Sequence, residues 1–262
     1  MPKLSIYFDY ELQQGADMMK PKGDWGRKEY RNTNQLLELL DKYDVKVCFA
    51  TLGKIAEGEN LPYSSISQVQ RIEKKGHEIG CHSYYHHLTS DISFETLYEN
   101  IRDARERLDS VISTEVITFV PPGNIPFNFL GIPVVKKKSA LRNIPFLKHF
   151  RLRAKLPSFR KKVHETVRRA GYKIYREYDF MINQESYTDQ NGLRIQKLNF
   201  TGFGNDVQDY LKNQSKENEL ITCYGHPKSL SEEGEESFEA LENLLKVIKN
   251  QNIDTILPRE VT

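Results

Sequence analysis

The chain has 262 residues, of which 38% are hydrophobic and 28% are charged, and its formal net charge is +2. This composition is typical of a folded protein with a sizeable core and excludes a chain that is disordered throughout. No apolar run approaches the roughly 20 residues that a membrane-spanning helix requires. The three cysteines (Cys48, Cys81 and Cys223) lack a C-x-x-C spacing, which argues against a disulfide framework or a cysteine zinc site. The apolar run at the N-terminus is too short for a secretory signal, so we expect a cytoplasmic protein.

Segments typical of strands and of helices alternate along most of the chain. Short apolar runs predict strands over residues 4–9, 45–50, 77–81, 116–120, 172–175, 220–224 and 254–257. Apolar periodicity and end signals predict helices over residues 33–43, 65–75, 94–108, about 158–170 and 235–250. Thr33 is a plausible N-cap, and Gly76 and Gly171 suit positions just after helix ends. Repeated strand-then-helix units indicate parallel strands with right-handed crossovers, in either a barrel or an open doubly wound sheet.

Residues 125–157 interrupt this alternation and are predicted to form an insertion. The charge is uneven, because Lys136 to Lys173 contains 14 Lys and Arg but only one acid, Glu165. That segment carries +13, so the rest of the chain carries −11. A basic segment on an acidic body predicts an anionic partner or surface, although a solvated flap without function is the alternative.

In parallel α/β folds the reactive groups gather at the carboxyl ends of the strands. In this sequence polar residues follow several predicted strands at that position. Asp9 and Glu11 end the first strand, and their two-residue spacing puts them on one face. His82 and His86 follow the third strand, with a spacing that brings both rings to one side. His226 follows a late strand. Two carboxylates and three histidines at one edge indicate a metal-dependent hydrolase, unless the carboxylates only cap a helix or pair with the basic insertion.

The order of these motifs resembles the polysaccharide deacetylase family, also called the NodB homology or carbohydrate esterase family. Phe8-Asp9-Tyr10-Glu11 resembles its first motif, an acidic pair after an apolar strand. Its second motif, His-Ser/Thr-x-x-His, is matched by His82-Ser83-Tyr84-Tyr85-His86. Phe119-Val120-Pro121-Pro122-Gly123 resembles the third motif, and Tyr224-Gly225-His226-Pro227 the last. The resemblance extends from Tyr7 to Pro227, nearly the whole chain.

The resemblance implies a distorted, incomplete (β/α) barrel of about seven parallel strands, formed as a single domain over residues 1–262. It also implies metal-dependent removal of an N-acetyl group from a sugar. His82 and His86 would bind one divalent ion, with zinc as the expected metal. Of the two carboxylates, Glu11 would be the third ligand and Asp9 the general base, although family sites usually have an aspartate at the ligand position.

Other roles follow from the same resemblance. His226 would protonate the departing amine, and Asp179 would hold its imidazole in place. A backbone N–H near Pro122 and Gly123 would help to stabilise the oxyanion. Trp25, on an expected loop, could stack on a sugar ring or equally pack onto the barrel.

One position departs from the family. Val120 stands where the family usually has an arginine that pairs with the catalytic aspartate, and a valine cannot orient a carboxylate. Three explanations remain open: an arginine of the basic insertion takes over, the activity is lowered, or the site has changed its substrate.

The basic insertion guides the expected substrate. A cytoplasmic deacetylase would act on a nucleotide- or lipid-linked amino sugar during surface polysaccharide biosynthesis, and Lys and Arg bind the phosphates of such intermediates. Apolar residues among the charges would also suit contact of residues 136–173 with an anionic membrane. A carbohydrate-binding relative without activity and a hydrolase of another amide, such as a formyl group or a cyclic ureide, are the alternatives. We expect no nucleic-acid partner, because the sequence lacks the usual binding motifs.

Overall fold

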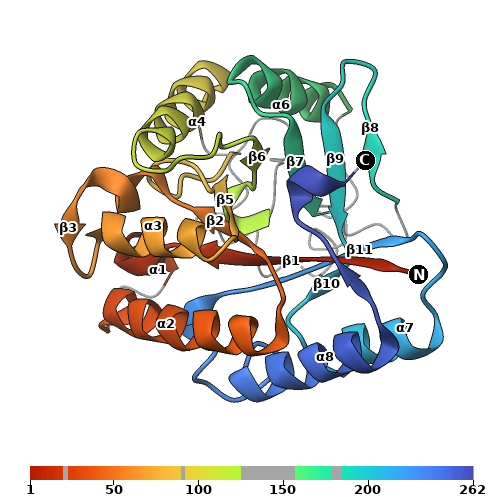
Figure 1. The fold of residues 1–262 in the computed structure, drawn as a ribbon. Helices are drawn as coiled ribbons and strands as arrows, with labels where there is room; N and C mark the ends of the chain where they lie inside the picture. The colour runs from red at the N-terminus through yellow and green to blue at the C-terminus, as the bar shows by residue number, and fades with distance from the viewer. Residues whose placement is uncertain (20–22, 90–91, 125–156, 179–184, 262) are drawn as a thin grey trace, which may run out of the picture.

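The computed structural model describes residues 1–19, 23–89, 92–124, 157–178 and 185–261. Nearly all of the predicted insertion at 125–157, and also Asp179, therefore lies outside the described residues. Within them, ten strands form one curved sheet in the order β10-β11-β1-β2-β5-β6-β7-β9-β8, with β12 also paired to β1 (Figure 1). The strands are β1 Lys3–Tyr10, β2 Cys48–Thr51, β5 Glu78–Cys81, β6 Thr118–Phe119, β7 Ile174–Tyr178, β8 Tyr187–Thr188, β9 Arg194–Leu198, β10 Phe200–Thr201, β11 Leu220–Gly225 and β12 Asp254–Thr255. A separate hairpin joins β3 Glu59–Asn60 to β4 Ser64–Ser65.

Every strand pair of the large sheet is parallel except β8 with β9. The predicted fold class, a distorted and incomplete (β/α) barrel, is therefore confirmed. The number of parallel strands among the described residues is nine rather than about seven, because β9 and the two-residue strand β10 were not predicted.

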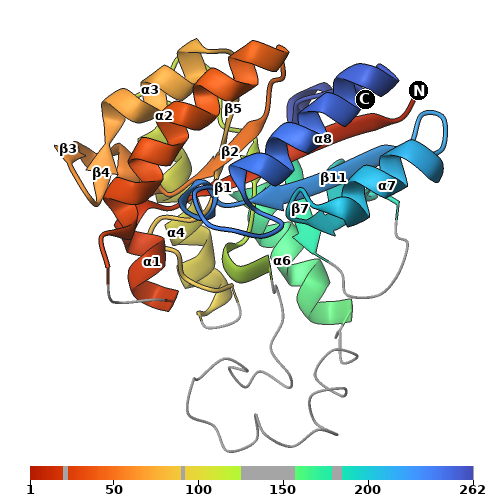
Figure 2. The same cartoon turned by 90° about the horizontal axis from the view of Figure 1, so that it is seen from below.

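Helices surround the outer face of the curved sheet, with α2 beside α8 and α4 beside α6 (Figures 1 and 2). The α-helices are α1 Leu12–Met19, α2 Trp25–Tyr43, α3 Ile66–Lys74, α4 Phe94–Asp109, α6 Pro157–Arg169, α7 Asn205–Asn213 and α8 Phe238–Gln251. Short 3₁₀ helices are η1 Gly53–Glu57, η2 Pro122–Asn124, η4 Pro227–Ser229 and η5 Pro258–Glu260. Among the described helices, none combines the length and apolar character needed to cross a membrane.

Helix α2 begins eight residues earlier than predicted. Its N-cap is Asp24, whose side chain accepts from the Arg27 amide, and Thr33 lies buried inside the helix. The Thr33 hydroxyl donates to the backbone carbonyl of Glu29 at 2.8 Å. The first turns were missed because their buried face is polar, with Glu29 and Asn32 in place of apolar residues.

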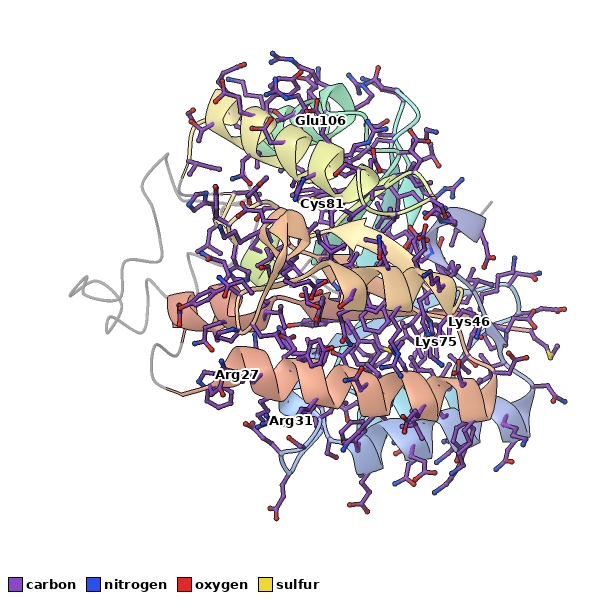
Figure 3. All side chains as sticks on the ribbon, turned by 60° about the vertical axis from the view of Figure 1, so that its left-hand side comes forward. Arg27, Arg31, Lys46, Lys75, Cys81 and Glu106 are labelled. Atoms are coloured by element: carbon purple, nitrogen blue, oxygen red, sulfur yellow. The ribbon has the colours of Figure 1, made fainter. Side chains whose placement is uncertain are left out.

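Strand β1 separates the apolar core from a polar interior. Leu4, Ile6 and Phe8 belong to the main hydrophobic cluster under the helices. Tyr7 belongs to a second, small cluster, and Asp9 has the same parity along the strand. The alternation of side chains along β1 thus places the carboxylate of Asp9 on the face opposite to Leu4, Ile6 and Phe8, which belong to the core. Figure 3 shows the contrast between interior and surface, with Cys81 enclosed by the fold and Arg27 and Arg31 on the outer side of α2.

Candidate active site

The residues predicted to carry chemistry follow strands that are neighbours in the sheet. β11, β1, β2 and β5 lie side by side and parallel, so their carboxyl ends reach the same edge. Glu11 comes directly after β1, His82 directly after β5 and His226 directly after β11. The structure therefore brings together residues that are up to 215 positions apart.

Glu11, His82 and His86 form a compact, buried group. The Oε1 atom of Glu11 lies 3.1 Å from Nε2 of His86 and 3.5 Å from Nε2 of His82. Ser83 and His86 both have a left-handed backbone, with φ of +69° and +64°, which curls the connecting loop so that both rings face the carboxylate. The ligand atoms of the three residues all lie within 4.8 Å of one another.

The chemistry of this group fits a divalent metal ion. His82 Nδ1 lies 2.9 Å from the carbonyl oxygen of Val120, to which it donates in the tautomer that leaves Nε2 unprotonated. Within the described part of the chain, Nε2 of this fully buried ring has no hydrogen-bond partner. Two imidazoles and one carboxylate are a common donor set of catalytic zinc sites, which keep a coordination position open. Val120, although it lacks the family's guanidinium, thus supplies a backbone oxygen that orients the ring of His82.

Asp9 is paired with an arginine that the sequence analysis did not identify. Its Oδ2 atom accepts a hydrogen bond from Nη2 of Arg176 at 2.9 Å, and both side chains are buried. The guanidinium of Arg176 lies 5.0 Å from the ring of Tyr7 and 4.7 Å from the ring of Tyr224. Arg176 belongs to β7, outside both the third motif and the basic segment. An arginine therefore does pair with Asp9, but it belongs to β7 and not to the basic insertion, where the sequence analysis had looked for a replacement.

The surroundings of Asp9 keep its carboxylate ionised. Burial by itself raises the pKa of Asp9, but the charges of Arg176, His82 and His226 outweigh burial and lower the pKa below its usual value. The second oxygen, Oδ1, has no hydrogen-bond partner among the described residues. Asp9 therefore offers a free, charged oxygen at the site.

His226 is held by a glutamate that was also not predicted. Oε2 of Glu236 lies 3.0 Å from Nδ1 of His226 and accepts from its backbone N–H at 2.9 Å. Burial alone lowers the pKa of His226, but the hydrogen bond to Glu236 and the charge of Glu11 raise it above its usual value. The other ring nitrogen, Nε2, lies 3.8 Å from Oε1 of Glu11. Asp179, expected in the supporting role, lies outside the described residues.

Two more charged residues, Lys228 and Glu29, lie close to Glu11. Nζ of Lys228 contacts Oε2 of Glu11, and the lysine side chain is 18% exposed. Glu29 of α2 is fully buried, and burial is the largest cause that raises its pKa to about 8. Neither residue belongs to a motif, so the sequence carried no signal for them beyond the position of Lys228 two residues after His226.

The three residues predicted to contact substrate lie at different places. Pro122 and Gly123 form η2 just after β6, with Pro122 buried and Gly123 exposed in a left-handed conformation of φ +70°. Trp25 begins α2, half-buried, with Nζ of Lys28 5.1 Å from its ring. The adjacent amide of Gly26 donates to the Gln13 side chain at 3.0 Å, which places this helix start near the segment after β1. Roles for these residues toward a sugar stay predictions.

Comparison with known proteins shows which family part of this chain resembles. The family profile for polysaccharide deacetylases matches residues 23–126. A bifunctional xylanase/deacetylase of Pseudobutyrivibrio xylanivorans is 28% identical over 108 residues, which are 40% of this chain and 17% of that protein. The uncharacterized protein YlxY of Bacillus subtilis (strain 168) is 31% identical over 98 residues, 37% of this chain and 28% of that protein. The matches thus span less than a third of these curated relatives.

Solved structures share the fold at low sequence identity. PuuE allantoinase has a TM-score of 0.64 and 13% identity, covering 95% of this chain and 84% of that one. A family 4 acetyl xylan esterase from Clostridium thermocellum, in complex with a cobalt ion, has a TM-score of 0.54 and 15% identity, covering 98% and 89%. A CE4 family pseudoenzyme from Bacillus anthracis has a TM-score of 0.54 and 12% identity, covering 98% and 64%.

The profile match and the fold confirm the family that the motifs predicted. Residues 23–126 of this chain match the polysaccharide deacetylase family, and the chain shares its fold with a family 4 acetyl xylan esterase.

Proposed function

We propose that this protein is a metal-dependent hydrolase that removes an N-acetyl group from an amino sugar, with zinc as its ion. The observation that carries the proposal is the convergence of three histidines on one carboxylate oxygen. Nε2 of His82, His86 and His226 lies within 3.8 Å of Oε1 of Glu11, and Asp9 lies beside His82. The polysaccharide deacetylase match over residues 23–126 supports the same reaction class.

The metal site would consist of Glu11, His82 and His86. A bound divalent ion lowers the pKa of its water from 15.7 toward about 7 and polarises the carbonyl of the acetyl group. Asp9 accepts the proton of the attacking water on Oδ1, while Arg176 holds Oδ2 and keeps the carboxylate in one orientation. The lowered pKa of Asp9 ensures that this base is ionised at neutral pH.

His226 serves as the general acid. The amine of a sugar leaves poorly unless its nitrogen is protonated, and help of this kind typically contributes 10²–10⁴-fold. Glu236 holds Nδ1, so Nε2 is the nitrogen that gives its proton to the amine. The raised pKa of His226 keeps the imidazolium populated nearer neutrality. A backbone N–H near Pro122 and Gly123 donates to the developing oxyanion in this scheme.

The proposed substrate is a nucleotide- or lipid-linked N-acetylated sugar of surface polysaccharide biosynthesis. The excess of Lys and Arg between 136 and 173 supports a phosphate-bearing substrate. Three cations of that segment pair with carboxylates of the body, namely Arg160 with Glu177, Arg169 with Glu95 and Lys173 with Glu115, and we do not assign these to phosphate. Since such intermediates are assembled in the cytoplasm, we place the reaction there or at the inner face of the membrane.

Acetate release tests the proposal. The zinc-loaded chain is incubated with UDP-N-acetylglucosamine, N-acetylglucosamine, N-acetylated chitooligosaccharides and allantoin. Acetate and free amine are quantified for the sugars, and allantoate is quantified for allantoin. We expect acetate and amine in equal amounts from an N-acetylated sugar, and a loss of about 10²-fold or more in Asp9→Asn and His226→Gln.

The surface variant Asp41→Asn, whose carboxylate pairs with Lys75 away from the site, is the matched control and should keep its rate. Sugar binding without acetate release would overturn the enzymatic proposal in favour of a binding protein. Hydrolysis of allantoin alone would assign the site to a different amide.

A further inference from the structure

The two oxygens of the Glu11 carboxylate have different surroundings. Oε1 faces the Nε2 atoms of His82, His86 and His226 at 3.5, 3.1 and 3.8 Å. Oε2 points away from these rings and contacts Nζ of Lys228. A carboxylate can give a metal ion one oxygen or both, so the partner of Oε2 decides how many coordination positions Glu11 occupies.

Lys228 is fixed by the backbone around it. It lies in η4, which begins at Pro227 immediately after His226. Asn32 of α2 donates from Nδ2 to the carbonyl of Pro227 at 2.8 Å and to the hydroxyl of Ser231 at 3.1 Å. These bonds attach the short helix to α2 on both sides of the lysine. The side chain of Lys228 is only 18% exposed, so this lysine belongs to the interior of the site and not to the protein surface.

The ammonium group of Lys228 lies directly against Oε2 of Glu11. Charge-assisted hydrogen bonds of this kind are stronger than neutral ones, which favours one fixed orientation of the carboxylate.

We propose that Lys228 is a positioning residue that holds Oε2 of Glu11 and so restricts this ligand to binding a metal ion through Oε1 alone. The restriction keeps one coordination position open for water or the acetyl oxygen. Glutamate has one more rotatable bond than the aspartate that is usual in the family. The contact with Lys228 restricts the additional side-chain conformations that this bond allows. The inference depends on the metal site of the proposed function.

The coordination number of bound cobalt tests this role. Co²⁺ is added to the metal-free wild type and to Lys228→Met, and the visible absorption per bound ion is recorded with the rate of acetate release. Without the lysine, Glu11 can bind through both oxygens, so we expect a weaker cobalt band, typical of a higher coordination number. We also expect the rate to fall about 10- to 100-fold, as for other residues that orient metal ligands.

Two further variants make the test specific. Lys228→Arg retains a cation and should restore the wild-type cobalt band. Lys42→Met removes a lysine of α2 that pairs with Glu242 at 2.7 Å, and it should leave both band and rate unchanged. Circular dichroism confirms that each variant is folded.

An unchanged cobalt band in folded Lys228→Met would overturn the positioning role while leaving the proposed function intact. No cobalt uptake by the wild type would instead overturn the metal-dependent function and this inference with it. If the wild type binds cobalt but releases no acetate, the function fails, and the spectra still decide the role of Lys228.

Discussion

Asp9 and Glu11 are two residues apart, both buried, and yet suited to different tasks. Each has one oxygen paired with a cation, Arg176 for Asp9 and Lys228 for Glu11. The remaining oxygen of Glu11 faces three imidazoles, whereas that of Asp9 has no hydrogen-bond partner among the described residues. This asymmetry supports Glu11 as the metal ligand and Asp9 as the base, an assignment that stays a prediction.

Replacing Arg176 by methionine should affect both stability and catalysis. The substitution leaves the buried carboxylate of Asp9 without its cation, and breaking a buried ion pair in this way typically costs about 3–5 kcal/mol. We expect urea unfolding to show a loss of that order and acetate release to fall sharply. Arg176→Lys keeps the charge and should lose less of both. A folded Arg176→Met variant with the wild-type rate would show that Asp9 needs no orienting cation.

His77 gives the chain a pH-dependent stability that is separate from catalysis. Its Nδ1 accepts from the amide of Val47 at 3.2 Å, and burial lowers its pKa from 6.5 to about 4. The unfolded chain therefore binds a proton in this range more readily than the folded one. The contribution of neutral His77 to the free energy of unfolding is fully present above pH 6.5. It is lost as the pH is lowered to about 4, and the total loss is about 3 kcal/mol.

The measurement is the free energy of unfolding of wild type and His77→Asn between pH 7 and pH 4.5. Asparagine can accept the same hydrogen bond through Oδ1 without titrating, so the variant should show a smaller loss over this range. Parallel curves for the two proteins would mean that His77 does not contribute to the pH dependence.

At the scale of elements, alternation and end signals in the sequence predicted most elements that face the apolar core. Helix α7 is an exception, since it was not predicted although its Val207 and Leu211 are buried in that core. Helix α3 ends just before Gly76 as predicted, whereas Ser65, predicted as its first residue, is its N-cap. The predicted apolar face of α4 is largely buried. The pattern failed where an element faces the polar site, as at the start of α2. Strand β9 was missed for a related reason, because its sequence Arg194–Leu198 contains buried Gln196 and Lys197.

The unpredicted site residues share a feature that sequence alone shows only faintly. Arg176 and Glu236 are charged residues outside every motif, and they meet their partners only after folding. Arg176 lies beside Glu177 in a strand whose other residues are tyrosines and an isoleucine, and a buried arginine requires a partner. That was the one available signal, and it identified neither the partner nor the site.

Helix α1 constrains the site through a glycine. A Cβ added to Gly15 would overlap the side chain of Glu11, including Oε2. Gly15→Ala would ordinarily stabilise a helix by about 1 kcal/mol. Here we expect the methyl group to displace the ligand, so that zinc affinity falls about tenfold or more even if the helix is retained.

Zinc titration with a competing chelator measures this effect. Gly58→Ala is the matched control, because a Cβ there meets nothing within 4 Å and the backbone is extended. Equal zinc affinities for Gly15→Ala and the wild type would show that Glu11 does not need its present position.

At the scale of the whole molecule, the parallel sheet explains why the site lies where it does. The carboxyl ends of neighbouring parallel strands lie at the same edge of the sheet. Because the alternation of strands and helices predicted a parallel sheet, it also predicted that the polar residues after these strands would lie close together. The number of strands was not predictable to the same degree. β10 has two residues, and pairing with β11 rather than local preference defines it.

The most direct test of this account is the zinc content of the purified chain after titration and removal of free metal. The intact chain should hold about one zinc ion, since three protein ligands suffice for a catalytic site. His82→Ala and Glu11→Ala should each lose it while remaining folded by circular dichroism. An intact chain that binds no zinc at micromolar concentrations would contradict the metal-dependent mechanism.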